Sequence, residues 1–113
     1  MHELGITQSI VEIALRTAAG QNAKKIHSVT LEVGSLAGVV AEALEFCYEA
    51  CSKDSLLEGS RLIIESIPAK ARCRDCALEY PLIELLSCCP ACSSVSGDLI
   101  CGEELRIKEM EID

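Results

Sequence analysis

The sequence has few aromatic side chains and an acidic excess of charge. Tryptophan is absent from its 113 residues, and Phe46, Tyr48 and Tyr80 make up the 3% that is aromatic. Stacking platforms for bases and a large aromatic-lined ligand pocket are therefore unavailable. Lysine and arginine number 10 against 18 acidic residues, for a formal charge of −8. We therefore expect no attraction to nucleic-acid phosphates or anionic lipid, and an aliphatic core.

Long hydrophobic runs are also missing. Residues 1–20 contain Glu3 and Glu12 and show no basic stretch followed by an unbroken apolar run, which is the pattern of a secretory signal. The longest apolar runs are only a few residues, against the roughly 20 that a membrane span needs. We expect a cytoplasmic protein that does not use a membrane, in which cysteine thiols stay reduced.

Two stretches of the chain have helical periodicity. From Leu4 to Ala19 the apolar positions recur at helical spacing, and Gly20 follows as a C-cap. A second helix is predicted over 39–52. The predicted buried positions of the two helices are Ile6, Ile10, Ile13, Ala14 and Thr17 in the first, with Leu4, Val11, Leu15 and Ala18 widening the stripe, and Val40, Ala43, Leu44, Cys47 and Cys51 in the second.

Three stretches are predicted to form strands. Val29, Leu31 and Val33 alternate with polar residues, and His27 precedes them as a structural or solvated residue. An apolar run from Leu62 ends at Pro68. Residues 105–112 alternate, with a change of phase at Lys108 and Glu109 that a β-bulge would produce.

Between Pro68 and Gly102 the helical and strand periods vanish, and six of the eight cysteines lie there. A segment that small needs a metal or disulfides to hold it. The predicted fold is α+β, a small mixed three-stranded sheet with two helices plus an inserted zinc-ribbon-like lobe. Residues 1–67 and 103–113 would form the αβ domain, and 68–102 the zinc-binding lobe.

The strongest motif is C-x2-C-x12-C-x2-C, formed by Cys73, Cys76, Cys89 and Cys92. Two such turns can converge on one tetrahedral ion, and four thiolates leave no open position, so the site is structural. Zn²⁺ is the favoured occupant, with iron and a pair of disulfides as the alternatives. Cys88 could replace Cys89, although Cys89 gives the better turn. Arg72 and Arg74 flank the first turn and could offset its negative charge, whereas Cys101 is expected to be an apolar filler.

The second unusual feature is a histidine at position 2. The α-amino nitrogen of Met1, the backbone and imidazole nitrogens of His2 and the Glu3 amide can together form a nitrogen-rich planar site. Such sites suit Ni(II) or Cu(II). The alternative is a solvated histidine at a frayed end.

Signs of catalysis are lacking. The sequence has no glycine-rich phosphate loop, no nucleophile elbow and no pair of carboxylates placed for acid–base work. We therefore expect a protein that is not an enzyme. A zinc-ribbon adaptor that binds another protein, without a nickel function, is the alternative interpretation.

The start Met1-His2-Glu3, the αβαβ order, the four-cysteine lobe and the closing strand together resemble the HypA/HybF family of hydrogenase maturation factors. The resemblance implies a nickel metallochaperone with Ni²⁺ as transient cargo and structural Zn²⁺. It implies nickel binding by His2, with Met1 and Glu3 contributing backbone nitrogen, and zinc binding by Cys73, Cys76, Cys89 and Cys92.

The resemblance also implies partners: a nickel-inserting maturation GTPase and the [NiFe]-hydrogenase large subunit, with urease served in some organisms. A homodimer is left open. Two departures from the family concern the nickel site. Some members add a carboxylate ligand from the turn before the second helix, but that position is Val40 here, and Glu42 is the nearest acid. Some members also recruit a second histidine from the zinc lobe, and this lobe has no histidine.

Overall fold

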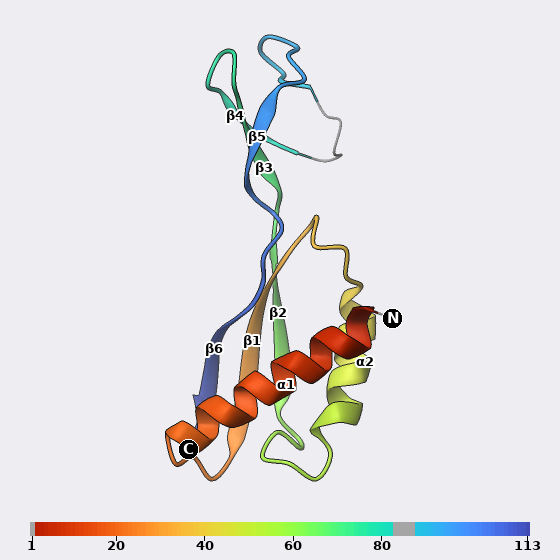
Figure 1. Ribbon diagram of the computed structural model, residues 1–113, viewed down its shortest axis with the longest axis vertical. Helices are drawn as coiled ribbons and strands as arrows, with labels where there is room; N and C mark the ends of the chain where they lie inside the picture. Colours follow the sequence, from red (N-terminus) through yellow and green to blue (C-terminus); the bar gives the residue numbers. More distant parts are fainter. Residues whose placement is uncertain (1, 83–87) are drawn as a thin grey trace. The chain divides into compact units, whose positions relative to one another are not determined.

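The computed structural model describes residues 2–82 and 88–113, and its helices and strands are shown in Figure 1. Their order and bounds are α1 (His2–Gly20), β1 (Ile26–Gly34), α2 (Ala41–Ser52), β2 (Arg61–Ile67), β3 (Lys70–Cys73), β4 (Glu79–Pro81), β5 (Gly97–Cys101) and β6 (Leu105–Ile112). The chain divides into two compact units. Unit 1 comprises Met1–Glu32, Gly38–Glu65 and Arg106–Asp113, and unit 2 comprises Val33–Ala37 and Ser66–Leu105.

Unit 1 contains both helices, which pack against each other. The buried positions of α1 fall on one face of the helix, where each has another buried position three or four residues away: Thr7, Ile10, Val11, Ala14 and Ala18. Two residues predicted to be buried are not: Ile13 is 49% exposed, and Thr17 is exposed too. None of the helices in the described part of the chain is long and apolar enough to cross a membrane.

The buried face of α2 differs from the predicted one. Leu44, Tyr48 and Ser52 are buried, at spacings of four, whereas Cys47 and Cys51 are only half-buried. The helix begins at Ala41 because Val40 has an extended backbone and acts as the N-cap, with a side chain that is 56% exposed. The core of unit 1 therefore takes tyrosine from this helix where cysteine was predicted.

The sheet has the strand order β2-β1-β6 and is mixed, as predicted. The Asp113 N–H donates to the Lys25 carbonyl, so the end of β6 meets the start of β1 and these strands are antiparallel. The Ser35 N–H donates to Ile67, so β1 and β2 end together and run parallel. Central β1 buries Val29, Leu31 and Val33 in the core.

Unit 2 has a sheet of its own, with the order β4-β3-β5 and both pairs antiparallel. Ala71 on β3 pairs with Tyr80 on β4 and with Leu99 on β5. The sequence pattern missed these strands because each spans only three to five residues, too few for an alternation to show. The small core of unit 2 consists of Ala71, Cys73 and Tyr80 from this sheet and Cys89 from outside it.

Candidate metal centre

Four cysteine side chains converge within unit 2. Cys73 ends β3 and Cys76 lies in the turn that follows, whereas Cys89 and Cys92 belong to a second turn before β5. All four Sγ atoms lie within 4.8 Å of one another, and the Cys73–Cys92 and Cys76–Cys89 pairs are each separated by 3.5 Å. Ligands about 2.3 Å from a tetrahedral Zn²⁺ are themselves about 3.8 Å apart. The cluster therefore fits a structural zinc ion.

The two turns have the same backbone hydrogen bonds. The carbonyl of Cys73 accepts from the N–H of Ala77, and the carbonyl of Cys89 accepts from the N–H of Ser93, both at 2.9 Å. The Cys73 N–H also donates to the Leu78 carbonyl, and the Cys89 N–H donates to the Ser94 carbonyl. Ala77 and Ser93 both have φ 63°, the left-handed conformation that closes such a turn. The two halves of the site are thus built from one repeated main-chain unit.

In the first turn, Cys73 favours the thiolate form. The Cys76 N–H lowers the pKa of Cys73 to about 7, and burial of the thiol opposes this shift. Because metals bind the thiolate and not the thiol, Cys73 is the cysteine of this turn that is prepared for a cation, whereas contact with the Cys89 sulfur and burial raise the pKa of Cys76.

Arg72 and Arg74, which flank the first cysteine turn, each form an ion pair. Arg72 donates to Glu79 and Arg74 to Asp98, each pair at 2.6 Å on the surface. The Arg72 guanidinium lowers the pKa of Glu79, and the Arg74 guanidinium lowers that of Asp98. These arginines therefore form ion pairs with carboxylates on the neighbouring strands.

The remaining cysteines lie outside the cluster. Cys88 is exposed, whereas its neighbour Cys89 is 1% exposed and supplies the clustered sulfur. Cys101 is half-buried and its thiol donates to the Pro68 carbonyl at 3.4 Å. All eight cysteines are in the described part of the chain, and all are free thiols.

The first turn of α1 lies beside the turn that precedes α2. His2 is the first residue of α1, and the side chains of Met1 and His2 lie outside the described residues. The Glu3 carboxylate accepts a hydrogen bond from the Val40 N–H at 3.2 Å, a contact that the sequence pattern did not reveal. Glu42 is exposed in the first turn of α2.

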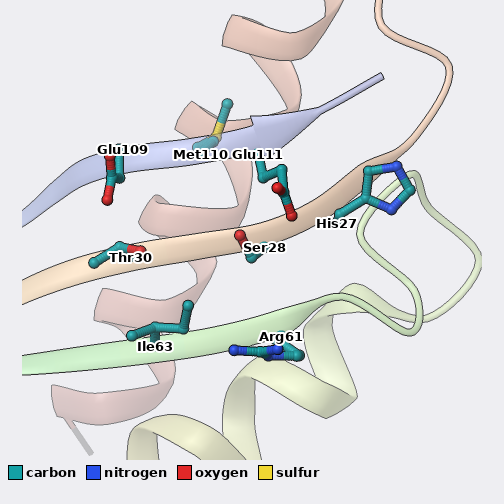
Figure 2. Close-up of a pocket in the computed structure, with 8 residues that line it drawn as sticks. All are labelled: His27, Ser28, Thr30, Arg61, Ile63, Glu109, Met110 and Glu111. Atoms are coloured by element: carbon teal, nitrogen blue, oxygen red, sulfur yellow. The ribbon is translucent and has the colours of Figure 1, made fainter.

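The second histidine lies on β1. His27 Nε2 is 2.6 Å from Asp113 Oδ1 near the end of β6, which gives this histidine a structural partner. It borders a groove on the sheet face opposite the helices, together with side chains of β2 and β6 (Figure 2). None of the four clustered cysteines lines this groove.

The chain matches one family model over residues 1–112, described as hydrogenase/urease nickel incorporation, metallochaperone, HypA. Curated relatives named hydrogenase maturation factor HypA include one from Geobacter metallireducens, 48% identical over 113 residues and all of both chains. Another, from Geotalea uraniireducens, is 49% identical over the same span.

Two solved structures have the same fold. The solution structure of the Ni metallochaperone HypA from Helicobacter pylori has a TM-score of 0.67 at 20% identity, covering 97% of this chain and 96% of that one. A second solution structure, of a HypA protein, has a TM-score of 0.75 at 22% identity over 100% and 97% of the chains. The full-length family match and these relatives show that the chain belongs to the HypA family of metallochaperones for nickel incorporation.

Proposed function

We propose that the protein binds Ni(II) at its amino terminus, through the imidazole and backbone nitrogen of His2 with backbone nitrogens of Met1 and Glu3. The observation that carries this proposal is a full-length family match to a chain whose second residue is a histidine at the head of α1. Backbone N–H groups in the first turn of a helix lie outside its i→i−4 ladder. Metal binding there would break no helical hydrogen bond.

The contact between Glu3 and Val40 supports a site with few side-chain ligands. It brings the turn before α2 to the start of α1, where residue 40 offers an apolar side chain and no donor atom. We therefore assign the nickel ligands mainly to His2 and the main chain. Nickel that is held by only one side chain can be transferred to another protein, as delivery requires.

The zinc ligands we assign are Cys73, Cys76, Cys89 and Cys92, because their sulfurs converge at tetrahedral spacing. They belong to the lobe of residues 68–102, and the nickel site to the domain of residues 1–67 and 103–113. The ion would hold the two turns together and leave no position open for a substrate. The protein on this proposal is not an enzyme.

The recipients we propose are the [NiFe]-hydrogenase large subunit and a nickel-inserting GTPase that acts with this protein in the cytoplasm. The relatives carry the name hydrogenase maturation factor, which supports the hydrogenase as recipient. Because an imidazole and an α-amine bind metal only after losing their protons, nickel affinity should fall on acidification. Protonation would therefore assist release to the recipient.

Calorimetric nickel titration of the zinc-loaded protein tests the terminal site. His2→Ala, and a version with extra residues before Met1, should both lose stoichiometric nickel binding while keeping their zinc. His27→Ala is the matched control, since it removes the only other histidine and should bind nickel like the wild type. Equal binding by all four proteins would place the nickel site elsewhere. Absence of binding in all four would favour a zinc-ribbon adaptor.

A further inference from the structure

The groove on the sheet face of unit 1 that points away from the helices is drawn in Figure 2. Its volume is about 650 Å³, within the range of about 300–1,000 Å³ that is typical of small-molecule sites. Polar side chains from all three strands line it: Ser28 and Thr30 from β1, Arg61 from β2, and Glu109 and Glu111 from β6. All of them belong to unit 1. The groove is therefore complete within one compact unit.

Ion pairs occupy the part of this sheet face that the groove leaves free. Arg106 on β6 pairs with Glu32 on β1 at 2.7 Å. Lys108, also on β6, reaches across β1 to Glu65 on β2 at 3.0 Å. In this half of the face, β6 is therefore basic, and the two strands beside it are acidic and neutralise its charge.

In the groove the arrangement of charge is reversed, and the charges stay apart. Arg61 lies on β2 and Glu111 on β6, the two outer strands, which are separated by two strand spacings of about 4.8 Å each. Neither residue forms a hydrogen bond or an ion pair in the part of the chain that the structure describes. Figure 2 shows Glu109 and Glu111 directed to the groove from β6. The groove therefore has a basic side and an acidic side that do not neutralise each other.

The floor of the groove, formed by the central strand β1, carries two hydroxyl groups. Thr30 is only 5% exposed, yet its hydroxyl forms no hydrogen bond among the described residues. Ser28, two residues earlier on the same face of the strand, forms none either. A buried hydroxyl normally has a partner, because leaving it unpaired costs free energy. A polar ligand that lies across β1 would supply partners for both hydroxyls.

The charges define the ligand by complementarity. One guanidinium on β2 can take a carboxylate through two parallel hydrogen bonds, and two carboxylates on β6 match two ammonium groups. We propose that the groove binds a basic α-amino acid such as lysine. Its carboxylate would lie on Arg61, its two ammonium groups on Glu109 and Glu111, and its aliphatic chain over Ile63, which also lines the groove.

Titration of the isotope-labelled, zinc-loaded protein with L-lysine, followed by NMR in the absence of nickel, tests this site. Lysine should shift the amide signals of Ser28, Thr30 and Glu111 in a saturable way, while those of β3 and β5 in unit 2 stay in place. Arg61→Gln should raise the dissociation constant for lysine on the order of tenfold, because it removes the partner of the carboxylate. Arg16→Gln removes an exposed arginine of α1 and is the matched control, which should bind lysine like the wild type.

Two analogues of lysine separate the contributions of its charged groups, and circular dichroism shows that each variant is folded. Cadaverine, which lacks the carboxylate, should bind more weakly than lysine, and Arg61→Gln should not weaken it further. Nα-acetyl-lysine, which lacks the free α-ammonium and resembles the last residue of a polypeptide, should also bind more weakly than lysine.

Three results would overturn the proposal. Lysine that causes no saturable shift would show that the groove does not bind it. Cadaverine that binds as tightly as lysine would show that the groove is only an acidic surface. Acetyl-lysine that binds more tightly than lysine would show that the ligand is the end of a polypeptide chain. The site is independent of nickel binding, so His2→Ala should bind lysine like the wild type.

Discussion

At the scale of single residues, Tyr48 is a polar residue buried in the core of unit 1. It is 4% exposed, and its hydroxyl lies 2.6 Å from Ser60 Oγ. Tyr48→Phe keeps the ring and removes the hydrogen bond, which should cost about 1 kcal/mol in urea unfolding of the zinc-loaded protein. Ser60→Ala should cost a similar amount, and the double variant little more than either. Additive losses would show that the two hydroxyls do not interact.

Burial raises the pKa of Tyr48, although its hydrogen bond to Ser60 opposes the shift. The folded state therefore favours the neutral phenol. This contribution is fully present below the pKa of an unfolded tyrosine, about 10, and is lost as the pH rises through the higher folded value. The free energy of unfolding should fall more steeply above about pH 10 in the wild type than in Tyr48→Phe. Parallel profiles would contradict this.

The residues that could be predicted from the sequence are those whose chemistry is local. Two C-x2-C turns specify their own geometry, so Cys73 and Cys89 could be placed in one cluster without knowledge of the fold. The outermost buried positions of a helix could not be predicted in this way. Periodicity shows which face of the helix is apolar, but not how much of that face the rest of the protein covers. Ile13 and Val40 are exposed for that reason.

At the scale of elements, the two cysteine turns depend on a left-handed residue after each pair. Ala77 and Ser93 occupy equivalent positions at φ 63°, where a β-branched side chain is strongly disfavoured. Ala77→Val should therefore open the first turn and weaken zinc binding by on the order of tenfold, an expected cost of 1–2 kcal/mol. Ala77→Gly, which adopts this conformation without strain, is the control. Competition with a chromophoric chelator measures both, and equal affinities would rule out this role of the backbone.

The longer helices and strands could be predicted from the sequence, whereas the short strands could not. Both helices and β1, β2 and β6 were found from periodicity, and the phase change in β6 also appears in its pattern of exposure. The strands β3, β4 and β5 were missed, because their order comes from pairing around the cysteine turns and not from an alternating sequence. Such strands depend on the fold that surrounds them.

At the scale of the whole molecule, the two units differ in what stabilises them. Unit 1 has an aliphatic core shared by two helices and a sheet, whereas the core of unit 2 consists of Ala71, Cys73, Tyr80 and Cys89. Because two of those four residues are clustered cysteines, removal of zinc should unfold unit 2 first.

Hydrogen exchange before and after chelation measures this difference. Amides of β3 and β5 should lose their protection, whereas those of α1 and β1 should keep it, and the helical circular dichroism should persist because both helices lie in unit 1. Restoring zinc should restore the protection. If the amides of β3 stayed protected without zinc, the small core of unit 2 would be sufficient to keep that unit folded.

The strand order predicts that zinc affects how the rest of the chain folds. β2 ends at Ile67 and β6 begins at Leu105, so pairing of β6 with β1 must close the whole intervening loop. Within that loop β3 and β5 place Lys70 opposite Cys101. The entropic cost of closing a loop grows with its length. A lobe that zinc has already closed leaves only a few residues to be ordered when β6 pairs with β1, so this cost is smaller. We therefore expect β6 to pair with β1 faster in the zinc-loaded protein than in the zinc-free protein.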